Sequence, residues 1–203
     1  MMFDWASQPY NTLLLTFIFG PYFAEIVTDR LMAGGATEEA AKAGAQAYWG
    51  YGLTACGILI AILAPILGAI ADSKHRRMPW IWTFSVLYVV GAFGLWTAVP
   101  DTFGIVGVLI FFGIGLIGME FATIFTNALL PTLGDRRQIG AISGNGWAMG
   151  YIGGVLALIF MLLFLAESDK GVTLLGIEPV FGLDPAMREG TRSVGPLTAA
   201  WYV

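Results

Sequence analysis

Three polar side chains interrupt an otherwise apolar run at a spacing that lets them act together. Glu120, Thr123 and Asn127 lie at i, i+3 and i+7 in the segment 103–130, so on a helix they share one face. At 1.5 Å per residue, Glu120 lies about 15 Å from the Leu130 end of that segment, well inside a bilayer. An ionised carboxyl group there costs roughly 2.5–3.5 kcal/mol, so it must be protonated, paired or hydrated. We interpret the three as solute- or proton-binding candidates; the alternative for Glu120 is a structural carboxyl group bonded to a neighbouring helix.

A second polar stripe is predicted on the first apolar segment, residues 8–27. Asn11 lies within this run, and Asp4 and Glu25 are separated from it by multiples of seven residues. On a helix such residues drift along one stripe, and a polar stripe in a membrane faces protein or water. Asn11 is therefore a further candidate for a polar cavity. The alternative is that Asp4 and Glu25 are interfacial and that only Asn11 is buried.

The segment Gly68–Arg77 concentrates charge in a turn between two apolar runs. Asp72 lies one helical turn after Gly68 on the same face, and Arg76 and Arg77 follow at the next turn. Gly68 permits close contact between helices, and an acid that faces arginines at a helix end can form an electrostatic latch. The simpler alternative is an ordinary basic anchor at the cytoplasmic surface.

Composition places the chain in the membrane class. The 203 residues are 57% hydrophobic and 12% charged, with a mean hydropathy of +0.75, which is typical of an all-α polytopic membrane protein. No basic face indicates nucleic-acid binding. Cys56 is the single cysteine and the single histidine lies in a turn, so no disulfide framework, metal site or cofactor is predicted. An enzyme is not predicted either, because no second intramembrane acid accompanies Glu120 and no Ser/His pair is present.

The apolar runs predict five full spans and the start of a sixth, and the connections between them set the orientation. Five of the ten Lys and Arg residues lie in two short turns, 72–78 and 131–138, which alternation places on one side. Because basic residues favour the cytoplasmic side, the N-terminus is predicted to be cytoplasmic, and the connections 28–47 and 167–195 to be exposed extracytoplasmic loops. The predicted spans are 8–27, 48–71, 79–99, 103–130, 139–166 and 197–203.

The fifth predicted span carries a glycine repeat. Gly146, Gly150 and Gly154 lie at i, i+4 and i+8, a small-xxx-small face that favours close helix packing. Plain packing is the simpler interpretation, and sliding along this face during a conformational change is the alternative.

Several stretches together resemble one branch of the major facilitator superfamily. GAIADSKHRR (68–77) is similar to the superfamily's helix 2–3 loop, roughly Gly-x-x-x-Asp-x-x-x-Arg-Arg, with departures at Ser73 and His75. The stretches that resemble, in the same order, the vacuolar amino-acid effluxers and their bacterial relatives are DWASQPY (4–10), LTFIFGPYF (15–23), NALLP (127–131), SGNGWAMGYIGG (143–154) and REGTRSVGPLTAAWY (188–202).

The resemblance implies the N-terminal six-helix half of a twelve-helix fold, in which helices 1 and 4 line the central cavity. It therefore implies that Asn11, Glu120 and Asn127 face that cavity. It also implies that Asp72 holds a helix of a second half. From charge and side of the membrane, Arg76 or Arg77 is predicted to pair with Asp135.

Two functions are compatible with these features. The first is half of a secondary active transporter that moves a small polar solute, with amino acids as candidates, by alternating access in the bacterial inner (plasma) membrane. Alternating access needs two bundles, so a C-terminal six-helix half or a second copy is the expected partner, besides the lipid bilayer. The second is a truncated, non-transporting subunit that docks onto a larger membrane complex through its Gly-rich faces.

Overall fold

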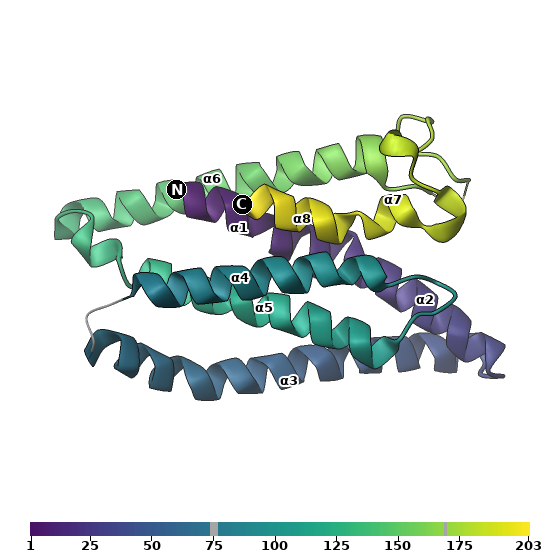
Figure 1. The fold of residues 1–203 in the computed structure, drawn as a ribbon, viewed down its shortest axis with the longest axis horizontal. Coiled ribbons are helices and arrows are strands. Elements are labelled where there is room, and N and C mark those ends of the chain that lie inside the picture. The colour runs from purple at the N-terminus through teal and green to yellow at the C-terminus, as the bar shows by residue number, and fades with distance from the viewer. Residues whose placement is uncertain (74–76, 169) are drawn as a thin grey trace.

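The fold is helical throughout the part of the chain that the structure describes. The computed structural model describes residues 1–73, 77–168 and 170–203, and the side chains of all of these except 72, 73, 136 and 137. Within these residues there is no strand, and five helices are long and apolar enough to cross a bilayer. The predicted all-α polytopic fold is therefore confirmed. Figure 1 shows the helices running side by side along one long axis.

The helices follow the predicted order of spans, and the first two extend past both of their predicted ends, whereas α5 is shorter than its predicted span. The elements, in chain order, are α1 (Met2–Pro9), the π-helix η1 (Tyr10–Phe17), α2 (Phe19–Ala33), α3 (Glu38–Ser73), α4 (Met78–Gly94), η2 (Leu95–Thr97), α5 (Ile105–Asn127), η3 (Leu130–Thr132), α6 (Arg136–Phe160), η4 (Met161–Leu165), η5 (Val180–Gly182), η6 (Pro185–Met187), α7 (Glu189–Arg192) and α8 (Val194–Tyr202).

The first membrane helix is built from α1, η1 and α2, with a wide π turn in its middle. The amide of Ile18 donates to the carbonyl of Leu13 (2.9 Å), a step of five residues rather than four. The Thr16 hydroxyl makes the same five-residue step to the carbonyl of Asn11 (2.8 Å). Pro21, which has no N–H, follows the wide turn and leaves the Phe17 carbonyl without its usual donor. The π segment therefore changes the helical phase between Asn11 and the residues after it.

Buried tyrosines tie this first helix to its neighbours. The Tyr10 hydroxyl donates to the carbonyl of Phe112 in α5 (2.6 Å), and the Tyr22 hydroxyl donates to the carbonyl of Ala98 after η2 (2.5 Å). Both rings are fully buried among other aromatic side chains. A buried phenol needs such a partner, because an unsatisfied hydroxyl group is costly to bury. These two bonds therefore fix the height of the first helix against α5 and the end of α4.

Glycines let α4 and α5 approach backbone to backbone. A Cβ atom on Gly91 would lie 2.2 Å from the amide nitrogen of Gly115, and a Cβ atom on Gly118 would lie 2.4 Å from the amide nitrogen of Tyr88. Neither distance leaves room for a methyl group. Close approach of small residues is a main source of helix association in membranes, so this contact is the tightest seam of the bundle.

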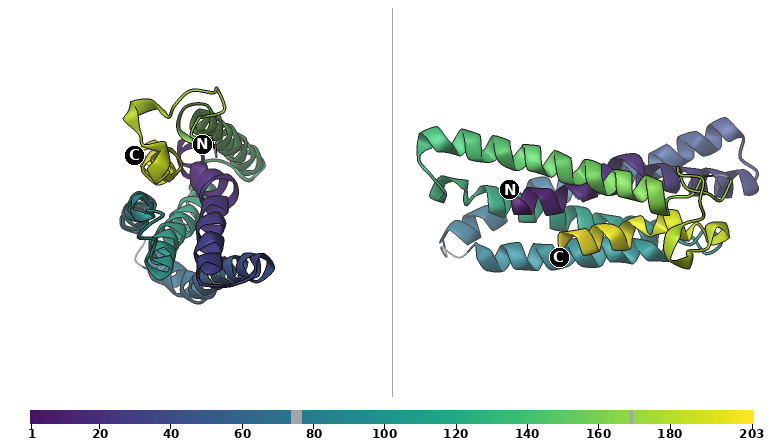
Figure 2. Two further views of the ribbon diagram at one scale, coloured as in Figure 1. Left: turned by 90° about the vertical axis from the view of Figure 1, so that its right-hand side faces the viewer. Right: turned by 90° about the horizontal axis from the view of Figure 1, so that it is seen from above.

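The connections gather at opposite ends of the bundle. Figure 1 shows the end of α3, the start of α4 and the α5–α6 turn at one end, and the α2–α3 and α4–α5 connections and the start of α7 at the other. The top view in Figure 2 shows the same two ends, with the α5–α6 turn at one and the segment before α7 at the other. The helix ends that flank the two basic turns thus lie together, as alternation of the spans requires. We keep "inner end" for this end and "outer end" for the opposite one; the side of the membrane that each faces stays a prediction.

The connection 28–47, predicted as a loop, is mostly helical. Helix α2 continues to Ala33, and α3 begins at Glu38, where the Thr37 hydroxyl accepts a hydrogen bond from the amide of Ala40 (3.4 Å). Lys42 pairs with Glu38 one turn earlier (2.6 Å), which supports an exposed helix. The helices extend beyond the apolar segments because their polar ends satisfy their own backbone. Hydropathy alone therefore placed the end of α2 too early and the start of α3 too late.

The connection 167–195, predicted as an exposed loop, is partly buried. Glu167, Thr173, Thr191 and Arg192 are all less than a tenth exposed. The segment folds back over the outer end of the bundle and then enters α8. The prediction of full exposure was wrong for these residues. Glu167, Thr191 and Arg192 are buried because their charged and hydroxyl groups find hydrogen-bond partners on one another or on other parts of the chain.

Candidate functional site

Asn11 and Thr123 meet around one methionine between the first helix and α5. The Asn11 side-chain amide donates to the Met119 sulfur (3.8 Å). The Thr123 hydroxyl donates to the Met119 carbonyl (2.8 Å) and lies 3.9 Å from the same sulfur. A thioether is a weak acceptor. The Asn11 side chain makes no other hydrogen bond within the described residues, so its amide oxygen and second N–H group stay available. Both side chains are half-buried.

Glu120 follows Met119 directly and lies seven residues before the inner end of α5. Its side chain is half-buried and makes no hydrogen bond or ion pair with any residue that the structure describes. A carboxyl group at this depth without a protein partner has its full capacity to bind a proton, water or a solute. Among the half-buried site residues Asn11, Glu120 and Thr123, Glu120 is therefore the one without a hydrogen bond to a described residue.

Asn127 stands apart from this group. It is exposed at the inner end of α5, one helical turn beyond Thr123. The structure thus brings Asn11 and Thr123 to one methionine, places Glu120 beside that methionine in the chain, and leaves Asn127 at the rim.

The predicted stripe Asp4–Asn11–Glu25 is divided among different neighbours. The Asp4 carboxylate accepts a hydrogen bond from the N-terminal ammonium (2.9 Å) and lies against Gly146 of α6. Asn11 contacts α5, and Glu25 pairs with Arg188 (2.6 Å). The sequence prediction assumed one regular helix, whereas the π segment η1 changes the phase between Asn11 and Glu25.

The predicted latch is described only in part. A Cβ atom on Gly68 would meet no described atom within 4 Å, so the glycine faces no helix among the described residues. Arg77 donates to the carbonyl of Ala128 at the end of α5 (2.5 Å), and Asp135 forms a capping box with Gln138 at the start of α6. The side chain of Asp72 and all of Arg76 lie outside the described residues. Pairing of Arg76 or Arg77 with Asp135 stays a prediction.

The glycine repeat of α6 lies along the first helix. A Cβ atom on Gly146 would lie 2.8 Å from a carboxylate oxygen of Asp4, and one on Gly154 would lie 2.4 Å from the hydroxyl of Thr12. Gly150 lies against the Asp4 backbone, where a Cβ atom would be 3.2 Å from the carbonyl oxygen. The repeat thus borders the polar side of α1 and η1.

An ion-pair network at the outer end was not predicted. Arg188 donates two hydrogen bonds to the Glu25 carboxylate (2.6 and 3.1 Å) and one to Glu167 (3.1 Å). Glu167 also accepts from the amide and hydroxyl of Thr191 (3.0 and 2.7 Å). The guanidinium group lies over the Tyr22 ring, 5.5 Å from its centre. The network joins the first helix, the end of α6 and the start of α7.

The electrostatics of this network favour a charged Arg188. Burial lowers the pKa of Arg188, but the hydrogen bond to Glu25 and the charges of Glu25 and Glu167 outweigh that effect and raise the pKa above its ordinary value. No local signal pairs residues so far apart in sequence. The one sequence feature that hinted at this network was that Glu25, Glu167 and Arg188, which carry opposite charges, lie at or near connections on the same predicted side of the membrane.

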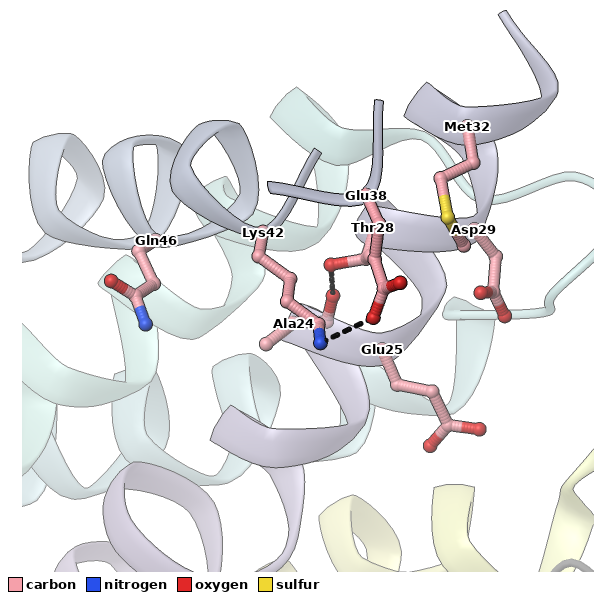
Figure 3. A pocket seen from close by; sticks show the side chains of 8 residues that line it. All are labelled: Ala24, Glu25, Thr28, Asp29, Met32, Glu38, Lys42 and Gln46. Carbon is pink, nitrogen blue, oxygen red and sulfur yellow. Dashed lines mark hydrogen bonds and ion pairs between the residues drawn. The ribbon is translucent and has the colours of Figure 1, made fainter. Parts of the chain in front are cut away.

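Glu25 also borders a pocket between α2 and α3. This pocket has a volume of about 400 Å³ and carries carboxylates from Glu25, Asp29 and Glu38. Figure 3 shows the Lys42 ammonium group reaching Glu38 (2.6 Å), while the Glu25 carboxylate turns away from that pair. Glu25 thus lies between this pocket and the Arg188 network.

Comparisons with known proteins agree with this architecture. The sequence model of the family described as "Vacuole effluxer Atg22 like" matches residues 51–174. A relative from Bacillus subtilis (strain 168), named "Uncharacterized MFS-type transporter YxiO", is 26% identical over 171 residues, which are 83% of this chain and 38% of the relative. The chain thus spans well under half the length of that relative. No solved structure matches the chain.

The matched segment runs from the start of the apolar part of α3 into the connection after η4. It contains the Gly68–Arg77 turn, all of α5 with Glu120, and the glycine repeat of α6. Because this segment is more than half of the 203 residues, the chain belongs to the Atg22-like vacuole effluxer family, a branch of the major facilitator superfamily (MFS).

Proposed function

We propose that this chain is the N-terminal half of a secondary active transporter that moves a small polar solute, with amino acids as the first candidates, across the bacterial plasma membrane. Glu120 carries the proposal, because a half-buried carboxyl group without a protein partner in a membrane helix is a functional site by default. Family membership and the MFS-type relative support the same class.

The proposed mechanism is alternating access between two bundles. A C-terminal six-helix half or a second copy of this chain supplies the second bundle. Asn11 and Thr123 orient the solute through the hydrogen-bonding groups that Met119 leaves available. Glu120 binds the coupling proton. Asn127 offers its side-chain amide to the solute at the inner end of α5.

The proposed orientation places the N-terminus and both basic turns in the cytoplasm. The excess of arginine and lysine in these turns supports it. In this orientation Gly68, Asp72 and the arginines after it contact the second bundle on the cytoplasmic side. The lack of any described atom near a Cβ on Gly68 supports that role, since no described residue of this chain covers that face.

Replacing Glu120 with glutamine is expected to abolish proton-coupled transport and leave membrane insertion intact. Glutamine keeps the size and hydrogen-bonding capacity of the side chain but cannot bind and release a proton at neutral pH. The measurement is uptake of labelled amino acids, singly and in mixtures, by proteoliposomes under an imposed pH gradient. These contain the protein purified from its own membrane with whatever second bundle accompanies it.

The matched control for that experiment is Glu178→Gln, which removes the same charge from an exposed position in the α6–α7 connection. This variant should transport at the wild-type rate. Gradient-driven uptake that survives unchanged in Glu120→Gln would refute the proton site. Absence of uptake of every solute in the wild-type protein would argue for the non-transporting subunit.

Replacing Gly68 with alanine should lower transport without lowering thermal stability, and so distinguish a contact with a second bundle from a contact within this half. The new methyl group meets no described residue of the chain, and alanine in a helix interior is about 1 kcal/mol more favourable than glycine. Thermal stability in detergent should therefore stay equal or rise. Transport should fall, because the methyl group occupies the contact with the second bundle. A variant with full transport would remove Gly68 from the latch.

A further inference from the structure

A second pocket lies on the other side of Glu25, between the first helix, the end of α6 and the connection 167–195. Its volume is about 410 Å³, within the range of small-molecule sites. Its polar wall contains Glu25, Arg188 and Thr173, and its apolar wall contains Pro21 and Leu162 among others. It lies at the outer end of the bundle, away from Glu120.

The pocket carries an excess of negative charge. Among its described residues, two carboxylates, Glu25 and Glu167, face one guanidinium group, that of Arg188. Each nitrogen of Arg188 donates one hydrogen bond to those carboxylates, so the positive charge is already paired and attracts a further anion only weakly. The outer-end connections also contain nearly twice as many acidic as basic side chains, which raises the local concentration of cations.

The two carboxylates differ in how many further hydrogen bonds they can accept from a ligand. The Glu167 side chain is 1% exposed and already accepts from Arg188 and from the amide and hydroxyl of Thr191. The Glu25 side chain is 42% exposed and accepts only from Arg188 among the described residues. A carboxylate offers about four acceptor positions, so Glu25 can take further donors from a ligand.

Thr173 gives an independent indication of a ligand. It lines the same pocket and is 4% exposed, and its hydroxyl oxygen has no hydrogen-bond partner within the described residues. Its backbone amide and carbonyl are both used in the turn with Ile177 and Gly176, so only the side chain lacks a partner. A buried hydroxyl group without a partner is costly, and a polar ligand atom would remove that cost.

We propose that this pocket binds a small organic monocation: a primary amine with a short aliphatic body and a hydroxyl group. The ammonium group binds Glu25, the aliphatic part lies along Pro21 and Leu162, and the hydroxyl group bonds Thr173. A zwitterion of the same length is disfavoured, because its carboxylate would approach Glu25 and Glu167 without a free cation to meet it. This site is separate from the one proposed for transport, and binding to it does not depend on transport.

Three probes of equal chain length test the proposal on the full chain in detergent, by isothermal titration calorimetry. Aminobutanol should bind most tightly, butylamine several-fold more weakly, and γ-aminobutyric acid at least about tenfold more weakly than aminobutanol. Glu25→Gln should weaken both amines at least about tenfold, whereas Glu178→Gln, an exposed acid outside the pocket, should change neither.

Thr173→Val keeps the proposal testable even if Glu25→Gln disturbs the ion-pair network. Valine has nearly the shape of threonine and leaves Arg188, Glu25 and Glu167 untouched. The variant should remove the preference for aminobutanol over butylamine and leave the affinity for butylamine unchanged. Equal binding of all three probes by the wild-type chain, no binding of any of them, or a preference that survives Thr173→Val would overturn the proposal.

Discussion

Replacing Arg188 with glutamine is expected to lower the free energy of unfolding by about 3–5 kcal/mol, the range found when one partner of a buried ion pair is removed. The buried partner is Glu167, whose side chain is 1% exposed and would lose its cation. The Glu25 pair adds less, because Glu25 is 42% exposed and solvent screens it. Denaturant unfolding in detergent would measure the change.

Two further variants separate the loss of the ion pair from a general effect of charge. Lys170→Gln removes a positive charge from an exposed position in the same connection and should change stability by less than about 0.5 kcal/mol. The double variant Glu167→Gln/Arg188→Gln should be more stable than Arg188→Gln alone, since the buried charge is gone. A single Arg188→Gln variant as stable as Lys170→Gln would show that the network contributes nothing to the fold.

Replacing Gly118 with alanine is expected to destabilise the bundle by about 1–3 kcal/mol or more. The new methyl carbon would lie 2.4 Å from the amide nitrogen of Tyr88 and 2.7 Å from the carbonyl oxygen of Phe84. Both atoms belong to the backbone of α4 and cannot rotate away. The two helices must therefore separate, which weakens the contacts along the whole seam, including Gly91 against Gly115.

The matched control is Gly107→Ala on the same helix. A Cβ atom there would meet no described atom within 4 Å, so alanine should be neutral or stabilising through its better helix propensity. The two variants should therefore shift the thermal midpoint in detergent in opposite directions, or only Gly118→Ala should lower it. Equal midpoints would mean that α4 and α5 can separate without lowering the stability of the bundle.

The number and order of the membrane helices could be predicted because they depend on local properties of the chain. An apolar run long enough for a bilayer must form a helix there, since each backbone amide and carbonyl needs a partner inside the same segment. Helix ends also depend on polar residues, which an apolar run does not reveal. Helix α3 begins ten residues before the predicted second span because Thr37, Glu38 and Lys42 stabilise an exposed first turn.

The candidate site could be predicted only as far as one helix determines it. The spacing of Glu120 and Thr123 places them on one face of α5 whatever surrounds that helix. The position of Asn11 relative to Asp4 and Glu25 could not be read in the same way, because the wide turn η1 interrupts the regular phase that the prediction assumed.

By itself, the sequence determined the class of the protein, its five candidate spanning helices and a carboxyl group within one of them. Each of these follows from residues close together in the chain. Only the tertiary structure decided that Asn11 and Thr123 meet at Met119, that Arg188 joins Glu25 to Glu167, and that Thr173 is buried without a partner among the described residues. These features need segments far apart in the chain to pack against one another, and the energies that select such contacts depend on distance, burial and complementary charge, which sequence spacing does not contain.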